Sequence, residues 1–409
     1  MKAAILSVGT ELLFGQITNT NTVYLSQQMN IMGFDVMYHY TVGDNPGRVE
    51  DMINLAFEDC DLILTTGGLG PTQDDLTKEV ACKVMDDRLV MMEDVLEEIV
   101  KYFKTLGREM TENNKKQAVM PSRATVFHND AGTAPGFALE KNGKYIICMP
   151  GPPREMTRMF QKSVLPFLQA MSEDVIYYRV ARMFGIGESM LETKLLDLID
   201  NQTDPTLATY AKEGECSLRV ASKRHTAQEA KKAVDEVMKT VNERLGEYIY
   251  SFDDEELVQV VCKKLMDKGL TISSAESCTG GLFAKSVTDI PGISKCFDRG
   301  IVTYSNRAKM EELGVKEETL EKYGAVSEKT ALEMAEGLKR LSGSDICISV
   351  TGIAGPGGGT EEKPVGLVYI GFIYGDVELC KKVQMRNVNR KWNRHYALLS
   401  MLDVINKNI

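Results

Sequence analysis

The residues best suited to chemistry lie in two segments, one around Ser277 and one around Lys309. The first segment, Ser274-Ala-Glu-Ser-Cys-Thr-Gly-Gly281, offers the hydroxyls of Ser277 and Thr279. A serine can attack an amide carbonyl when a base removes its proton, and a lysine can be that base if burial keeps part of its amine neutral. Ser277 is therefore the candidate nucleophile and Lys309 the candidate base. Tyr304 would relay a proton or orient Lys309.

These residue types leave alternatives open. The spacing does not decide which of the hydroxyls of Ser277 and Thr279 attacks. Purely structural roles are also possible, because Ser277 can cap a helix, Tyr304 can be a packed aromatic and Lys309 a solvated helix residue. A Ser-His-Asp triad is not expected, since no histidine lies in or near these motifs. The four histidines are His39, His128, His225 and His395.

A strand and a helix must hold the first segment. Residues 270–272 are apolar and β-prone, which predicts a buried strand, and Gly280-Gly281 predicts a tight turn into a helix. Amide groups at a helix start are unpaired and attract an anion or a developing oxyanion. Further along, a Gly-rich loop follows an apolar strand at 346–350, and Arg390 and Arg394 lie one helical turn apart. Those arginines would bind a phosphate or pair with surface carboxylates. The predicted substrate-binding residues are Thr279, Gly280, Gly281, Asn306, Thr351, Gly352, Gly355, Arg390 and Arg394.

Four motifs in this part of the chain resemble the competence/damage-inducible protein family. They are Glu276-Ser-Cys-Thr-Gly-Gly281, Val302-Thr-Tyr-Ser-Asn306, Gly324-Ala-Val-Ser327, and Thr351-Gly-Ile-Ala-Gly-Pro356 with Lys363-Pro-Val-Gly366. The resemblance implies a carboxy-terminal deamidase that needs no cofactor and hydrolyses nicotinamide mononucleotide to nicotinic acid mononucleotide and ammonia. The chain departs from the usual family form at Val388-Asn389, where Gly-Asp is common.

A second candidate site lies near the amino terminus. Strand-like and helix-like segments alternate up to about residue 170, which predicts a doubly wound parallel sheet with ligands beyond the carboxyl ends of its strands. The loop Gly67-Gly-Leu-Gly70 follows one such strand and precedes Asp74 and Asp75. Its glycines would let backbone amides approach a phosphate, while the carboxylates would hold a divalent metal. Alternatively, the glycines only form a turn and an aspartate caps the next helix.

Three motifs of this region are similar to the molybdopterin-binding domain that opens competence/damage-inducible proteins. They are Thr65-Thr-Gly-Gly-Leu-Gly-Pro-Thr-Gln-Asp-Asp-Leu-Thr77, Gly132-Thr-Ala-Pro-Gly136 and Met149-Pro-Gly-Pro-Pro-Arg-Glu-Met156. The resemblance matches Asp44 and Asp75 to acidic positions and Gly67, Gly68 and Gly70 to the phosphate loop. It implies a metal-dependent ADP-ribose pyrophosphatase that releases AMP and ribose 5-phosphate. We predict the metal at Asp74 and Asp75, with its identity open.

The expected organisation is three α/β or α+β domains. Residues 1–172 form the molybdopterin-binding-like domain, 173–251 a small α+β module that resembles a KH-like insert, and 252–409 the deamidase domain. A KH clamp on RNA needs a Gly-x-x-Gly loop with basic flanks, whereas Gly185-Ile-Gly-Glu188 is acidic at its end. We therefore expect this module to be a spacer and an interface.

The composition narrows the function classes. The chain of 409 residues has a net charge of −10, which disfavours nucleic acid as a partner. No apolar run approaches the ~20 residues of a membrane helix, and the nine cysteines contain no Cys-x-x-Cys pair. We expect a cytoplasmic homodimer that acts on small nucleotides and does not bind membranes. The alternative is a non-catalytic pterin- or nucleotide-binding assembly protein related to competence or the DNA damage response.

Overall fold

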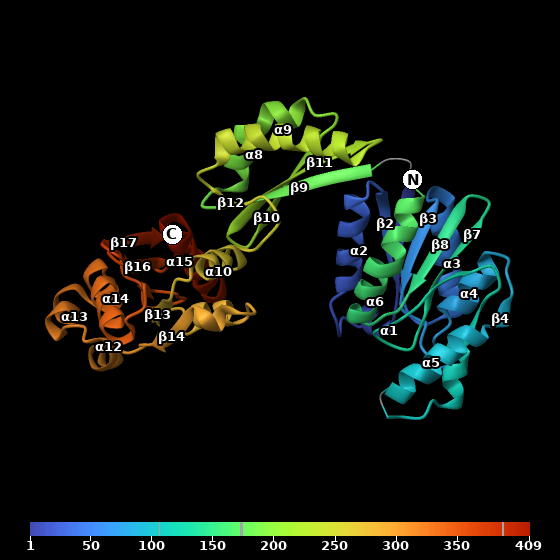
Figure 1. The fold of residues 1–409 in the computed structure, drawn as a ribbon, viewed down its shortest axis with the longest axis horizontal. Coiled ribbons are helices and arrows are strands. Elements are labelled where there is room, and N and C mark those ends of the chain that lie inside the picture. Colours follow the sequence, from blue (N-terminus) through green and yellow to red (C-terminus); the bar gives the residue numbers. More distant parts are fainter. Residues whose placement is uncertain (106, 172–174, 387) are drawn as a thin grey trace. The chain divides into compact units, whose positions relative to one another are not determined.

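The computed structural model describes residues 1–409 except 106, 172–174 and 387 (Figure 1). It divides into two compact units. The first contains residues 1–177 and 223–230, and the second contains 178–222 and 231–409. The boundary expected between residues 172 and 173 lies outside the described residues. Each unit combines a central sheet with covering helices, so the mixed α/β class predicted from the sequence is confirmed.

A six-stranded sheet of order β2-β1-β3-β8-β7-β6 forms the centre of the first unit. Neighbours among β2, β1, β3 and β8 are parallel, whereas β7 and β6 extend one edge in antiparallel fashion. Almost every side chain of β1 and β3 is buried, as in a parallel strand covered on both faces. The bounds are β1 Lys2–Val8, β2 Asp35–Val42, β3 Leu62–Thr66, β6 Thr125–Phe127, β7 Gly136–Lys141 and β8 Lys144–Met149.

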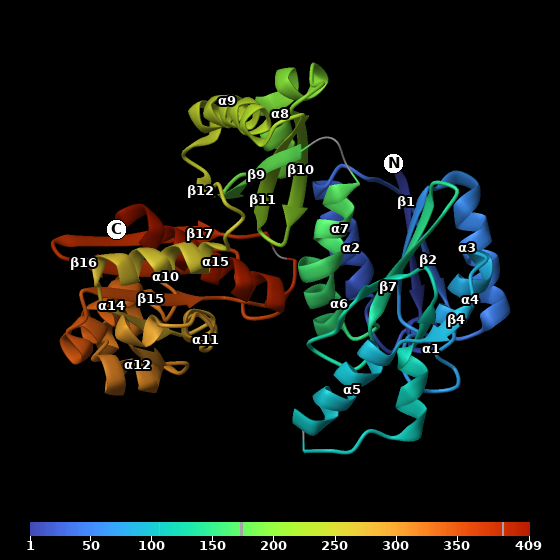
Figure 2. The same ribbon diagram turned by 45° about the vertical axis from the view of Figure 1, so that its right-hand side comes forward.

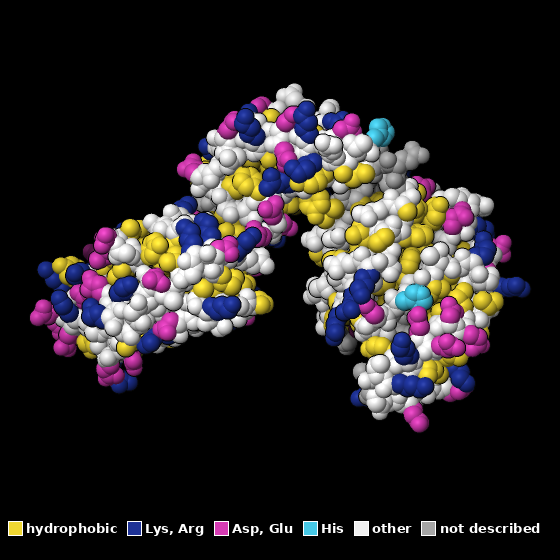
Figure 3. All heavy atoms as spheres, in the orientation of Figure 1, with side chains coloured by type: hydrophobic (Ala, Val, Ile, Leu, Met, Phe, Trp, Pro, Cys, Tyr) yellow, Lys and Arg dark blue, Asp and Glu magenta, His cyan; other side chains and the backbone are white. Residues whose placement is uncertain are grey.

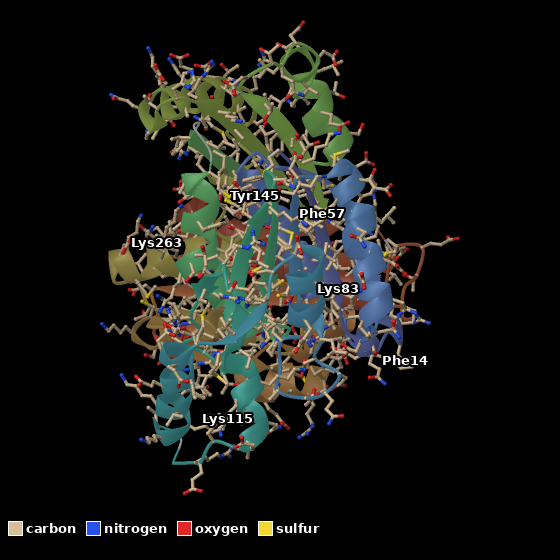
Figure 4. The ribbon with its side chains drawn as sticks, turned by 90° about the vertical axis from the view of Figure 1, so that its right-hand side faces the viewer. Phe14, Phe57, Lys83, Lys115, Tyr145 and Lys263 are labelled. Carbon is tan, nitrogen blue, oxygen red and sulfur yellow. The ribbon has the colours of Figure 1, made fainter. Side chains whose placement is uncertain are left out.

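Helices cover both faces of this sheet and give two separate apolar clusters. One face carries α2 Thr20–Ile31, α6 Pro153–Met159, the π-helical turn Phe160–Val164 and α7 Leu165–Ala170. The other carries α3 Pro46–Asp59 and α4 Thr77–Val84. Lys83 of α4, labelled in Figure 4, forms an ion pair with Glu50 of α3 at 2.7 Å. The doubly wound arrangement leaves the carboxyl ends of the parallel strands free for a ligand.

A smaller subdomain extends this unit. It contains the antiparallel pair β4 Leu89–Met91 and β5 Val119–Pro121, helix α5 Glu93–Thr105 and the 3-10 helix η1 Glu112–Ala118. The amine of Lys116 in η1 donates to the backbone oxygens of Thr72, at 2.8 Å, and Asp75. The subdomain therefore fixes the loop that follows β3. The remaining helix of the unit, α1 Thr10–Leu13, follows β1.

The middle module is a four-stranded sheet of order β10-β11-β9-β12 with two helices. Its elements are β9 Val175–Phe184, α8 Glu188–Asp200, β10 Thr206–Lys212, β11 Glu215–Arg224, α9 Ala227–Leu245 and β12 Ile249–Ser251. Strand β10 was not predicted from the sequence. This strand lies at the sheet edge and buries only Leu207, so it lacks the apolar alternation by which a strand is recognised.

The carboxy-terminal domain has a five-stranded sheet of order β14-β13-β15-β16-β17. The strands β14 Phe297–Val302, β13 Ile272–Glu276 and β15 Ile346–Gly352 are parallel, and β16 Leu367–Tyr374 and β17 Val377–Gln384 are antiparallel. Helices α10 Leu257–Lys268, α11 Leu282–Thr288 and α15 Arg390–Asn408, with the 3-10 turn Ile293–Lys295, pack on one face (Figure 2). The second apolar cluster involves α12 Asn306–Leu313, α13 Glu317–Tyr323 and α14 Glu328–Ser342.

The strand before Ser277 differs from the prediction. It was expected at 270–272 but occupies Ile272–Glu276, and all five of its side chains are buried. Two of its three buried polar side chains have partners: Ser273 is hydrogen-bonded to Ser344 at 2.8 Å, and the carboxylate of Glu276 accepts two amide protons, whereas the hydroxyl of Ser274 has no partner among the described residues. A search for apolar runs misses such a strand, because pairing rather than hydrophobicity makes its burial possible.

Among the described residues no helix combines the length and apolarity needed to cross a membrane. On the face drawn in Figure 3, acidic and basic side chains are interspersed on the described part of the chain.

The close packing of α14 gives a test of the fold. A Cβ at Gly337 would lie 1.9 Å from the backbone oxygen of Leu313, which cannot move independently. We expect Gly337→Ala to lower the free energy of unfolding by about 1–3 kcal/mol or more, measured by chemical denaturation. Gly357→Ala is the matched control, because a Cβ there meets nothing within 4 Å. Equal stability of the two variants would contradict the described packing.

Candidate active site

Ser277 and Lys309 meet at the carboxyl ends of two neighbouring parallel strands. Ser277 follows β13 directly, and Lys309 lies in α12, shortly after β14. The Nζ atom of Lys309 is 3.0 Å from the Oγ atom of Ser277 and donates a second hydrogen bond to the backbone oxygen of Thr303 at 2.8 Å. The structure thus brings together the predicted nucleophile and the predicted base, although they are 32 positions apart in sequence.

The surroundings of Lys309 favour the neutral amine. Its side chain is 1% exposed, and burial lowers its pKa from the ordinary value of 10.5. Within the described part of the chain it has no ion-pair partner to stabilise the ammonium form. The hydroxyl-bearing partner Ser277 is 8% exposed. A buried lysine without a counter-ion can accept a proton from a serine at a lower pH than a solvated lysine can.

Of the two hydroxyls left open by the sequence, that of Ser277 contacts the base. The Oγ1 atom of Thr279 is buried and has no hydrogen-bond partner among the described residues. The backbone oxygen of Thr279 accepts hydrogen bonds from Arg394, with the Nε atom at 3.1 Å. The geometry therefore favours Ser277 for attack and leaves the hydroxyl of Thr279 as a free donor.

The helix start after Ser277 is partly used by the protein itself. Gly280 and Gly281 have φ values of 59° and 89°, which an L side chain rarely adopts, and they turn the chain into α11. The carboxylate of Glu276 accepts the amides of Phe283 at 3.1 Å and Ala284 at 2.9 Å. These two amides, expected to be open to an anion, thus hold Glu276, which the sequence analysis gave no role. The only available signal was a carboxylate at the end of a strand before a helix start.

Tyr304 contacts an arginine and not the base. Its hydroxyl accepts a hydrogen bond from Nη2 of Arg390 at 2.8 Å, and the side chain is 60% exposed. The Nη1 atom of Arg390 donates to the backbone oxygen of Gly355 at 2.8 Å. Arg390 therefore connects the segment before α12 with the loop after β15. A direct relay between Tyr304 and Lys309 would require this contact to rearrange.

The other predicted substrate-binding residues have mixed environments. The hydroxyl of Thr351 donates to the backbone oxygen of Ala325 at 2.7 Å. Gly352 is crowded, since a Cβ would lie 2.5 Å from a methyl group of Val368. Asn306 begins α12 and is exposed. Thr351 and Gly352 are thus held by contacts within the domain, while the side chain of Asn306 is exposed to solvent.

The two arginines of α15 contact backbone oxygens. Arg390 and Arg394 donate to neutral backbone oxygens, and neither forms an ion pair within the ranges that the structure describes. Pairing with surface carboxylates, the alternative considered for them, is not what the structure contains. Two cations without a neutralising carboxylate, next to Ser277, suit an anionic group such as a phosphate.

A cavity of about 540 Å³ lies at the carboxyl ends of β1, β2, β3 and β8 in the first unit. Its walls bring together every residue predicted for the amino-terminal site, namely Asp44, Gly67, Gly68, Gly70, Asp74 and Asp75. The position follows from the topology, because the loops after parallel strands meet at one edge of the sheet. The volume is in the range of small-molecule sites.

The glycines of this cavity are required by close packing as well as by the turn. Gly67 and Gly68 have φ values of 104° and 68°. A Cβ on Gly67 would lie 2.0 Å from the backbone oxygen of Val8, and one on Gly68 would lie 2.1 Å from the hydroxyl of Thr77. The loop therefore adopts a path that only glycine permits.

The acidic residues of the cavity differ in their contacts. The carboxylates of Asp74 and Asp75 both contact the hydroxyl of Thr72, and this hydrogen bond lowers the pKa of Asp74. Asp44 accepts hydrogen bonds from the amide and hydroxyl of Thr10, at 2.9 and 2.7 Å. It thus fixes the start of α1.

The donor set at Asp74 and Asp75 is compatible with a divalent ion that also binds a ligand. Two carboxylate oxygens, one from each aspartate, contact the hydroxyl of Thr72, but one hydroxyl proton can satisfy only one carboxylate. Such an oxygen-rich group suits a hard cation. Among the described residues no cluster of three or more His, Cys, Asp or Glu could hold a metal. Phosphate oxygens would therefore have to complete the coordination, which is common for Mg²⁺.

Glu155 is a cavity residue that the sequence analysis did not assign. It lines the same cavity, and burial raises the pKa of its carboxyl group. Its Oε2 atom accepts a hydrogen bond from Asn129 at 2.7 Å. Its position in the motif that ends at Met156 was the available signal.

Comparisons with known proteins cover nearly the whole chain. Family models match residues 4–170 ("Probable molybdopterin binding domain"), 178–251 ("Damage-inducible protein CinA KH domain") and 254–409 ("CinA C-terminal domain"). A protein of Acetivibrio thermocellus, named as competence-damage inducible, is 49% identical over 409 residues, which is 100% of this chain and 99% of that protein. A "CinA-like protein" of Dictyoglomus turgidum is 47% identical with the same coverage. A solved competence/damage inducible protein from Agrobacterium tumefaciens is 43% identical and covers 36% of this chain and 90% of its own, with a TM-score of 0.36.

The lowered pKa of Lys309 predicts how stability depends on pH. Below the folded-state pKa both the folded and the unfolded chain bind this proton. Between that value and the ordinary 10.5 only the unfolded chain binds it, so the stability of the wild type rises with pH in this window. We expect the wild type to gain stability relative to Lys309→Met as the pH is raised toward 10.5, in denaturant titrations.

The control for this titration is Lys285→Met, because the side chain of Lys285 is 68% exposed. If wild type and Lys309→Met changed in parallel with pH, the amine of Lys309 would not have the environment described.

Proposed function

Because this chain belongs to the CinA family of competence-damage inducible proteins, we propose that it is a hydrolase with two nucleotide sites. The carboxy-terminal domain hydrolyses the carboxamide of nicotinamide mononucleotide, and the amino-terminal domain hydrolyses ADP-ribose. The observation that carries the first activity is the 3.0 Å contact between the buried amine of Lys309 and the hydroxyl of Ser277. The family resemblance of the surrounding motifs supports the choice of substrate.

In the first step of the deamidase the neutral amine of Lys309 takes the proton of Ser277. The Oγ atom forms a bond to the carboxamide carbon, and the carbonyl oxygen becomes an oxyanion. The free hydroxyl of Thr279 is a donor for that oxyanion. The tetrahedral intermediate then breaks its C–N bond, and the ammonium of Lys309 returns the proton to the departing nitrogen, which leaves as ammonia.

A second half-reaction regenerates the serine. Water attacks the ester on Ser277, with Lys309 again neutral and acting as the base. The carbon–oxygen bond to Ser277 breaks, its oxygen recovers a proton from Lys309, and the product leaves as a carboxylate. Arg390 and Arg394 bind the phosphate of the mononucleotide, which orients the carboxamide toward Ser277.

The amino-terminal site acts on a pyrophosphate. The amides of the loop at Gly67, Gly68 and Gly70 approach the phosphate oxygens. A divalent ion held by Asp74 and Asp75 would neutralise phosphate charge. Glu155, whose pKa is raised by burial, is the candidate general acid for the leaving phosphate oxygen.

Ammonia release tests the deamidase. We expect Ser277→Ala and Lys309→Met to lower kcat/KM for nicotinamide mononucleotide by at least about a thousandfold, because each removes one member of the proton-transfer pair. The wild-type kcat/KM should rise with pH as Lys309 becomes neutral. Lys285→Ala on α11 is the control and should keep full activity. Wild-type rates in both variants would rule out the assigned roles.

AMP release from ADP-ribose tests the amino-terminal domain. We expect turnover only with a divalent metal, and a loss of roughly a hundredfold in Asp75→Asn and Glu155→Gln. Asp51→Asn, at an exposed position of α3, is the control. Tight binding of ADP-ribose without any AMP release would instead identify a nucleotide-binding domain without turnover.

A further inference from the structure

A cavity of the second unit contains none of the residues placed in the two candidate sites above. It has a volume of about 520 Å³ and lies between the middle module and the carboxy-terminal domain. Four segments line it: the loop Gly185–Glu188, the turn between β10 and β11, the end of β17, and one face of α15. A space of this size can hold a mononucleotide.

A row of three aromatic rings reaches this cavity. Phe184 and Tyr396 have ring centroids 5.2 Å apart, and Tyr396 is stacked on Trp392 at 5.0 Å with an angle of 20° between the rings. Trp392 is the last ring of the row, lines the cavity and is only half-buried. A further planar ring can extend the row, because stacking on an indole is favourable for any purine or pyrimidine.

Two cations of the cavity can hold a phosphate. Lys212 and Arg386 line it, both are exposed, and neither forms an ion pair in the described part of the chain. Glu188 and Glu215 also line it, and the hydrogen bond that Glu215 accepts from Tyr250 does not remove its charge. The lining therefore has two cations and two carboxylates, and its cations are the groups suited to an anionic ligand.

The backbone at Gly187 is accessible from the cavity. A Cβ placed on Gly187 would meet no atom within 4 Å, so a ligand can approach the backbone there. On the opposite side the turn is tightly fitted, because a Cβ on Gly214 would lie 2.9 Å from the ring of Tyr396. The turn thus supports the aromatic row, while the loop at Gly187 leaves the space for the ligand.

We propose that this cavity binds a free purine nucleotide, with the base stacked on Trp392 and the phosphate held by Lys212 and Arg386. A purine base alone would stack on Trp392 but would not contact the cations. Inorganic phosphate would contact the cations but would not stack on Trp392. A single-stranded nucleic acid also contains bases and phosphates. Its additional phosphates, however, would be repelled by Glu188 and by the net charge of −10 on the protein. The free nucleotide is the ligand that uses both features.

The single tryptophan of the chain makes this site directly observable. Full-length protein is titrated with AMP, ADP, adenosine and inorganic phosphate while the emission of Trp392 is recorded. We expect saturable quenching by AMP or ADP, weaker binding of adenosine and no effect of phosphate. Arg386→Ala and Lys212→Ala should each raise the Kd by roughly five- to tenfold. Lys382→Ala, on β17 outside the cavity, should leave it unchanged.

Several results would overturn the proposal. They are the absence of saturable quenching at millimolar nucleotide, quenching that neither cation variant weakens, and complete displacement of AMP by nicotinamide mononucleotide, which would place the ligand beside Ser277. Binding of a short RNA far more tightly than of AMP would show that the ligand is a polymer. Circular dichroism of the variants, whose substituted side chains are exposed, verifies their folding.

Discussion

The candidate active site of the carboxy-terminal domain depends on one destabilising feature: the amine of Lys309 is buried without a counter-ion among the described residues. Such a group destabilises a folded protein whenever it is protonated, and natural proteins usually avoid it. Here the parallel pairing of β13 and β14 enforces it, because the segments after both strands are brought to one edge of the sheet. Among the described residues, the hydrogen-bond partners of the Lys309 amine are then the backbone oxygen of Thr303 and the hydroxyl of Ser277. Destabilisation of the protonated form lowers the pKa of Lys309 and so leaves more of the amine neutral and able to accept a proton.

The amino-terminal site follows from a different constraint, that of space. Its loop passes so close to Val8 and Thr77 that side chains at Gly67 and Gly68 would collide with them. The same lack of side chains exposes backbone amides to a ligand, so one property of glycine serves both packing and binding. In both units the site lies beyond the carboxyl ends of parallel strands, where loops from several strands converge.

The sequence was sufficient to predict the doubly wound sheet and a small α+β middle module, since continuous apolar strands, Gly-rich turns and helical periodicity have strong signals. It also identified residues that the structure brings together. The predicted amino-terminal site residues line one cavity, and Ser277 is hydrogen-bonded to Lys309. It could not predict features that depend on pairing between distant polar groups. The burial of Glu276, the contact of Tyr304 with Arg390 and the role of Asp44 at Thr10 each need a partner that only the folded chain supplies.

The choice of backbone oxygens as partners for Arg390 and Arg394 has an electrostatic consequence. A carbonyl dipole orients a guanidinium but does not cancel its charge, so a positive potential persists beside Ser277 in a protein whose net charge is −10. Small anions that diffuse near this spot are steered inward, whereas long polyanions are repelled by the rest of the surface. The association rate of such a ligand would decrease as added salt shortens the Debye length.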